Sequence, residues 1–134
     1  ALLNSYGVCL FHWMLDPAGY TPQDYYGKAY AAATGIDRTP DELMLDGARI
    51  CNLEKAFNSR IGMRREHDTV CERWMWEPTE EGMYPGSVAA EMFNPVLDEY
   101  YEWRGWDKDS GLQTRKSLEG VGLEDVADVR CDTY

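Results

Sequence analysis

Basic residues are scarce in this sequence: 13 Lys and Arg stand against 24 Asp and Glu in 134 residues, and the net charge is −11. A field of that sign repels phosphate backbones and anionic lipid surfaces. Long hydrophobic runs are also lacking, because Asn4, Gly7 and His12 interrupt the uncharged stretch 1–15, and a membrane-spanning helix needs about 20 apolar residues. We therefore predict no nucleic-acid partner and no membrane partner, and we interpret residues 1–15 as buried in protein.

Cysteine and histidine are few as well. The four cysteines, Cys9, Cys51, Cys71 and Cys131, form no C-x-x-C pair, so their spacing gives no support to a zinc site. His67 and Cys71 are four positions apart and could share a helix face. That region lacks two further ligands at suitable spacing, so a solvent-exposed histidine is the simpler interpretation. A helical chain of this size does not need disulfides, and we predict a protein of the reducing cytoplasm.

Two segments typical of helix starts have almost the same sequence, Thr21-Pro22-Gln23-Asp24 and Thr39-Pro40-Asp41-Glu42. In each, the threonine accepts an unpaired amide, proline occupies the first helical position, and an acid lies at the positive end of the helix dipole. The first helix should end at Gly35 and the second near Gly62, because glycine readily adopts the left-handed conformation that closes a helix. We predict that residues 21–62 form a two-helix core.

The second of these helices has the clearest amphipathic pattern. Its apolar residues recur at spacings of three and four, and we expect this face to be buried. The face consists of Leu43, Gly47, Ile50, Leu53, Phe57 and Ile61, while Asp46, Arg49 and Asn52 face elsewhere.

The rest of the chain predicts more helices and no sheet. Residues 63–93 contain Pro78, Gly82, Pro85 and Gly86 and should form an irregular, well-packed wrap. Residues 94–134 should form the C-terminal helices: one from Asn94-Pro95 to Gly105, one from Thr114 to Gly120, and one over Leu123 to Val129. No stretch alternates with period two, so the predicted fold class is all-α, as one irregular multi-helix domain over residues 1–134.

The segment from Asn4 to Cys9 is the strongest candidate for chemistry. By itself a lone cysteine is most often a buried structural thiol, because free Cys behaves as a small hydrophobe. The alternative is a cofactor loop, since Gly7 would let the backbone approach a bulky group and a thiolate is what an iron–sulfur cluster needs. One thiolate cannot hold a cluster, so this alternative requires cysteines from outside the chain. Known catalytic motifs such as G-x-S-x-G and H-E-x-x-H do not occur, and a complete active site is not predicted.

Several ordered blocks resemble the C-terminal region of the aldehyde ferredoxin oxidoreductase family. Residues 4–9 resemble the family's D-x-x-G-L-C loop, and residues 47–73 (GARICNLEKAFNSRIGMRREHDTVCER) resemble its helix and following basic turn. Residues 97–107 (LDEYYEWRGWD), 114–118 (TRKSL) and 122–128 (GLEDVAD) are similar to its ending in order and spacing. Several blocks in order are far more specific than any single motif.

The resemblance implies an oxidoreductase that holds tungsten or molybdenum on two pterins beside a [4Fe-4S] cluster, and that passes electrons from aldehyde oxidation to ferredoxin or another iron–sulfur carrier. It implies that Cys9 is the fourth ligand of the cluster. Asn4, Gly7, Val8 and Leu10 would then contact a pterin, together with Cys9. The residues that act on substrate would lie in the remaining N-terminal portion of the same enzyme, or in a companion subunit.

Asn4 departs from the family pattern, which has Asp at this position. The change removes a carboxylate charge, keeps one acceptor and adds two amide donors, so the hydrogen bonding to the pterin and the subfamily stay open. A second possibility within the family is a subunit that resembles the tungsten-containing benzoyl-CoA reductases. A possibility from another class is a helical interaction module without cofactors.

Overall fold

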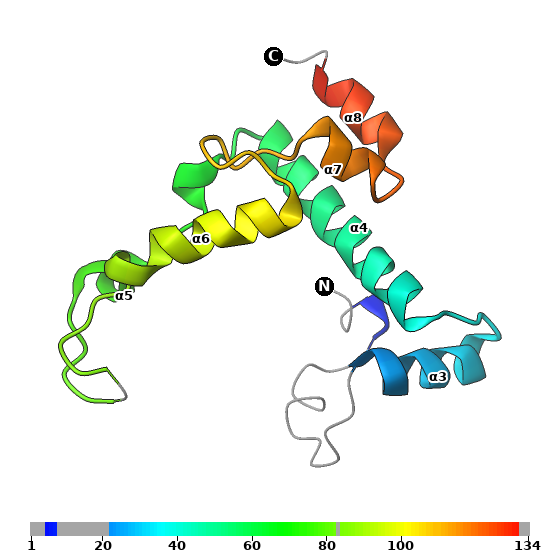
Figure 1. Ribbon diagram of the computed structural model, residues 1–134, viewed down its shortest axis with the longest axis horizontal. Coiled ribbons are helices and arrows are strands. Elements are labelled where there is room, and N and C mark those ends of the chain that lie inside the picture. Colours follow the sequence, from blue (N-terminus) through cyan, green and yellow to red (C-terminus); the bar gives the residue numbers. More distant parts are fainter. Residues whose placement is uncertain (1–4, 8–21, 83, 132–134) are drawn as a thin grey trace.

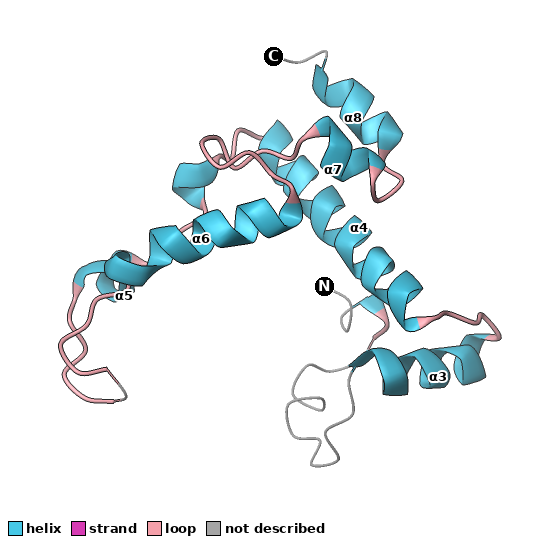
Figure 2. Cartoon of the chain, in the orientation of Figure 1, coloured by secondary structure: helices cyan, strands magenta, loops and turns pink. Residues whose placement is uncertain are grey.

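The computed structural model describes residues 5–7, 22–82 and 84–131. Over these residues the chain consists of helices and connecting loops, and no strand occurs, which confirms the all-α prediction (Figures 1 and 2). An isolated antiparallel bridge joins Trp106 and Gln113. The elements are α3 (Pro22–Thr34), α4 (Pro40–Arg60), η1 (Arg65–His67), α5 (Glu72–Trp76), α6 (Ala90–Arg104), α7 (Arg115–Glu119) and α8 (Glu124–Cys131). None of the described helices has the length and apolar content needed to cross a membrane.

The two helices predicted over residues 21–62 are α3 and α4, which diverge from the loop that joins them in Figure 1. At the start of α4 the Thr39 hydroxyl accepts the Glu42 amide at 3.3 Å, and the Glu42 carboxylate accepts the Thr39 amide at 2.8 Å. This reciprocal capping box confirms the predicted start. A Cβ atom on Gly27 would lie 2.8 Å from Leu43 Cδ1, so a glycine on α3 allows the close approach to α4.

The predicted buried face of α4 is wrong over its second half. Leu43 is 1% exposed, but Leu53, Phe57 and Ile61 are 51%, 66% and 67% exposed. The buried residues on this part of α4 are Asn52, Lys55, Ala56 and Ser59. The reason is that α6 and the segment 64–68 pack on a polar side of α4 and satisfy its polar groups there, which leaves the apolar stripe uncovered.

The predicted start of the third helix is also wrong, because α6 begins at Ala90 and carries Pro95 inside it. The turn before Pro95 is already helical, with the Phe93 amide donating to the Ala89 carbonyl at 2.8 Å. Proline removes one amide from the helix but does not prevent the preceding turn from forming. The predicted end is confirmed, since Gly105 closes α6 with a left-handed φ of 68°.

The helices α7 and α8 lie beyond the C-terminal half of α4, whereas α5 and the start of α6 extend away from it (Figure 1). Thr114 caps α7 by accepting the Ser117 amide at 3.1 Å, as predicted. Arg49 of α4 donates to the carbonyls of Val121 and Gly122 at 2.8 and 3.4 Å. This arginine therefore fastens the turn between α7 and α8 to the central helix.

Candidate functional site

Of the five predicted cofactor-contacting residues, the structure describes Gly7. Asn4, Val8, Cys9 and Leu10 lie outside the described residues. Gly7 has a φ of +70°, and a Cβ atom built on it meets no described atom within 4 Å. A left-handed φ disfavours other side chains, so this turn favours a glycine.

Tyr6 fastens the residue next to Gly7 to both core helices. Its hydroxyl donates to Asp46 Oδ2 on α4 at 3.2 Å, and its ring lies 4.6 Å, centroid to centroid, from that of Tyr30 on α3. Arg38 pairs with the same Asp46 oxygen at 3.4 Å. Burial, and after it the hydrogen bond to Asp46, together raise the pKa of Tyr6 to about 12. The phenol therefore keeps its proton and donates at neutral pH.

No role was predicted for Tyr6. A single tyrosine carries no spacing signal, and its partners lie on two other helices. Asp46 was placed away from the apolar face of α4, which agrees with a polar contact, but the contact itself depends on tertiary packing.

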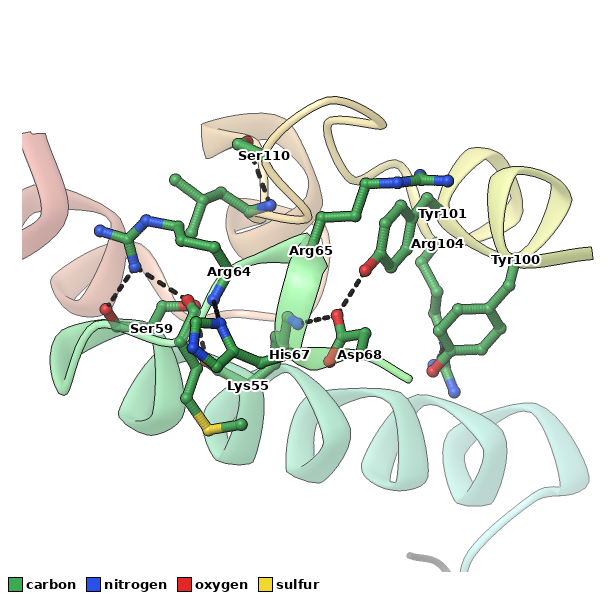
Figure 3. Close-up of polar contacts among 12 residues, drawn as sticks. Lys55, Ser59, Arg64, Arg65, His67, Asp68, Tyr100, Tyr101, Arg104 and Ser110 are labelled. Carbon is green, nitrogen blue, oxygen red and sulfur yellow. Dashed lines mark hydrogen bonds and ion pairs between the residues drawn. The ribbon is translucent and has the colours of Figure 1, made fainter. Parts of the chain in front are cut away.

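A second cluster joins α4, the segment 64–68 and α6 (Figure 3). Tyr101 is fully buried and Lys55 is 8% exposed. The Lys55 ammonium and the Tyr101 hydroxyl both donate to Oδ2 of Asp68. Burial raises the pKa of Tyr101, and its hydrogen bond to Asp68 adds to the effect. We call this set, Lys55, Asp68 and Tyr101, the polar joint.

Arg65 and Gly111 support the joint from the other side. The Arg65 guanidinium pairs with Asp98 of α6 at 2.7 Å and lies 5.4 Å from the centroid of the Tyr101 ring. Its backbone amide donates to the Ser110 carbonyl at 2.9 Å. A Cβ atom on Gly111 would lie 2.8 Å from the Tyr101 hydroxyl and 3.1 Å from the Arg65 backbone, so this turn packs directly on the joint.

Asn52 connects the turn after α6 to α4. The Trp106 indole N–H donates to Asn52 Oδ1 at 3.0 Å, and the Gln113 side-chain amide donates to the Asn52 carbonyl. All three residues are buried, so these hydrogen bonds avoid the cost of unpaired polar groups.

A groove of about 520 Å³ lies over the joint and is lined by Cys51, Lys55, Asp68, Leu97, Tyr101 and Trp106, among others. Within it the Lys55 ammonium and the Asp68 carboxylate neutralise each other and Tyr101 is held protonated, an arrangement that suits positioning of the helices. His67 is exposed and its Nδ1 accepts the Arg64 amide at 3.1 Å. Among the described side chains no group of three or more His, Cys, Asp or Glu could hold a metal ion.

The family model described as aldehyde ferredoxin oxidoreductase, domains 2 and 3, matches residues 1–123. The chain belongs to the aldehyde ferredoxin oxidoreductase family. The tungsten-containing aldehyde ferredoxin oxidoreductase of Pyrococcus furiosus is 34% identical over 92% of this chain, and that of Pyrococcus horikoshii is 32% identical over 93%. The enzyme of Thermococcus kodakarensis is 33% identical over 92%. In each case the match covers 19% of the relative, so the chain spans about a fifth of their length.

A solved structure is also similar to this chain. The active site complex BamBC of benzoyl coenzyme A reductase, in complex with 1,5-dienoyl-CoA, is similar with a TM-score of 0.67 and 28% identity, over 84% of this chain and 16% of that chain. The polar joint takes Lys55 and Asp68 from the block 47–73, and Tyr101 from the block 97–107. The two longest blocks behind the family resemblance therefore meet in space.

Proposed function

We propose that this chain is the C-terminal part of a cytoplasmic oxidoreductase with a tungsten or molybdenum bis-pterin and a [4Fe-4S] cluster, which oxidises aldehydes to carboxylic acids and passes electrons to ferredoxin. The observation that carries this proposal is the family match over residues 1–123, which includes the loop around Cys9. The relatives from Pyrococcus horikoshii and Pyrococcus furiosus are tungsten-containing enzymes. The substrate-acting residues would belong to the remaining N-terminal portion or to a companion subunit.

In this proposal Cys9 supplies the fourth thiolate of the cluster, and Asn4, Gly7, Val8 and Leu10 contact a pterin with it. Gly7 fits that role, because its left-handed backbone faces open space on the described side. When bound, the metal pterin and the cluster would supply the redox chemistry, which belongs to the cofactors. The chain's own contribution is to hold the loop in place.

Tyr6 supplies that positioning. Its hydrogen bond to Asp46 and its ring contact with Tyr30 tie the backbone beside Gly7 to α3 and α4. Two helices that share a capped, packed interface are a rigid support, and ligands held on rigid elements keep their geometry better than ligands on free loops.

The role of Cys9 is tested by Cys9→Ser in the complete enzyme, with iron content and the electron paramagnetic resonance of the reduced cluster as measurements. We expect loss of the cluster signal, because serine does not replace a thiolate ligand effectively. Cys51→Ser is the control, since Cys51 is a half-buried free thiol on α4. Full iron content and an unchanged spectrum in Cys9→Ser would overturn the proposal.

A second candidate is a benzoyl-CoA reductase-like subunit, which the structural similarity to the BamBC complex favours. The two candidates differ in substrate, so the purified enzyme is assayed with aldehydes and a low-potential acceptor, and separately with aromatic acyl-CoA thioesters. Turnover of aldehydes alone supports the first proposal. Turnover of a thioester alone supports the second.

A further inference from the structure

The segment from α5 to the first turns of α6 is built as a projecting arm. Figure 1 shows α5, the loop after it and the beginning of α6 reaching away from α4. We define the arm as residues 72–96. The family match spans the arm.

Hydrogen bonds within the arm give it a defined shape. The Ala89 amide donates to the Trp74 carbonyl at 3.3 Å, which joins the base of α6 to α5. In the loop between them, the Thr79 hydroxyl and the Ser87 hydroxyl both donate to the Tyr84 carbonyl at 2.7 Å. A surface that is ordered before it meets a partner binds at a smaller entropic cost.

Large apolar side chains on this arm face solvent. Trp74 is 70% exposed and Met92 is 65% exposed, and Trp76 and Val96 are also exposed. Tryptophan and methionine are enriched in the cores of protein interfaces, so Trp74 and Met92, which line one groove, suit an interaction surface.

The arm is also hollowed. A groove of about 620 Å³ lies between α5 and α6, with Trp74, Val88 and Met92 supplying apolar walls and Glu77, Glu80 and Glu81 supplying acids. One of the acids, Glu77, pairs with Arg73 at 2.9 Å. An apolar groove with an acidic margin fits an apolar side chain that is flanked by lysine or arginine.

We propose that this groove on the arm binds a segment of the oxidoreductase that lies outside this chain, and that the segment places an apolar side chain between basic ones. The length of the relatives supports this occupant, because the chain spans about a fifth of them and the arm is retained within that part. The inference rests on the proposed function in one respect, which is that the chain works as part of a larger oxidoreductase.

The test is hydroxyl-radical footprinting of the intact oxidoreductase as purified, with oxidation of Trp74 and Met92 measured by mass spectrometry. We expect both side chains to be oxidised roughly tenfold more slowly than in the urea-unfolded enzyme, because oxidation follows exposure. Rates within about twofold of the unfolded enzyme would overturn the proposal. The protection could instead disappear on dilution, at concentrations where the native mass falls to that of one copy. That result would assign the groove to a second copy of the enzyme and would also overturn the proposal.

The acidic margin is tested by the double variant Glu80→Lys, Glu81→Lys in the same enzyme. We expect faster oxidation of Met92 at low salt, because like charges would then face the basic partner. Glu91→Lys is the matched control, since Glu91 is exposed on the same arm and does not line the groove. An equal effect of both changes, or none from the double variant, would overturn the proposed charge of the partner.

Failure of this inference is distinguishable from failure of the proposed function. Footprinting of Trp74 and Met92 does not depend on the iron bound by Cys9. Retained protection without a cluster overturns the cofactor assignment alone, whereas a cluster with an unprotected arm overturns the docking proposal alone.

Discussion

Tyr101 is fully buried, and its hydroxyl donates to Asp68 within the polar joint. Tyr101→Phe leaves the carboxylate with one donor fewer, which costs about 1–3 kcal/mol. We expect the amides of α6 to exchange hydrogen about tenfold faster or more in the native protein, since local opening follows that free energy. Tyr100→Phe is the control, because its surface hydroxyl only accepts a bond from Arg104 at 3.2 Å. Equal effects would contradict a special role for the buried hydroxyl.

Gly111 has little room beside its backbone. Its φ is +70°, and an added Cβ atom would lie 2.8 Å from the Tyr101 hydroxyl and 3.1 Å from the Arg65 backbone. Gly111→Ala therefore combines left-handed strain of about 1–2 kcal/mol with a steric clash. We expect a clear fall in the urea concentration at which half of the helical circular dichroism signal is lost. Gly86→Ala, at φ +81° with open space around it, should show the strain alone and a smaller fall.

At the scale of elements, the cap of α4 gives a pH dependence. Hydrogen bonds from the Thr39 amide and then the Thr39 hydroxyl hold the pKa of Glu42 below its ordinary value. A lowered folded pKa adds stability above the unfolded pKa, and that stability is lost as pH falls through the folded pKa. We expect first-turn amides of α4 to lose protection as the pH falls below the ordinary pKa of glutamate and through the lower folded pKa of Glu42, after correction for intrinsic exchange. Glu42→Gln keeps the cap but cannot titrate, so it should show no such step.

Tyr6 connects the loop to its two supporting helices. Tyr6→Phe keeps the ring contact with Tyr30 but removes the hydrogen bond to Asp46. In the complete enzyme we expect iron to be present at first and then to pass to a chelator several-fold faster than from the wild type. Tyr25→Phe on α3 is the control, since it removes a hydroxyl from a half-exposed ring. Release at the wild-type rate would show that the hydroxyl does not hold the loop.

Several starts and ends of elements followed from local chemistry, but the start of α6 and the packing of the helices did not. Thr39, Thr114 and Gly105 act where the capping rules place them. The apolar stripe of α4 indicated a helix correctly, but periodicity does not tell which surface covers which face. Here Asn52 and Lys55 face inward because Trp106 and Asp68 supply their partners from distant parts of the chain.

At the scale of the whole molecule, the site was predicted from family resemblance and not from periodicity or spacing. The loop around Cys9 could be named because its motif is local. The polar joint could not, because it requires that the blocks 47–73 and 97–107 meet, and no short-range signal encodes that contact. The assignment of Cys9 and its neighbours stays a prediction.

The separate chain should expose apolar surface to solvent. Leu53, Phe57, Val126 and Val129 line an apolar groove of about 280 Å³ between α4 and α8, in addition to the arm. We expect the separate 134-residue chain to bind the dye anilinonaphthalene sulfonate strongly, because exposed apolar grooves take it up. Phe57→Ser should reduce the dye signal, whereas Tyr100→Phe should not. A chain that binds no dye would show that these faces close on themselves.

Asp68 offers the same oxygen to Lys55 and Tyr101, and this sharing has an evolutionary consequence. Loss of the carboxylate would leave a buried ammonium and a buried phenol without their acceptor. Loss of either donor would leave the carboxylate with only one of its two partners. Natural variants should therefore exchange the three positions as a set, with an uncharged residue replacing the acid only where an apolar residue replaces the lysine and phenylalanine replaces the tyrosine.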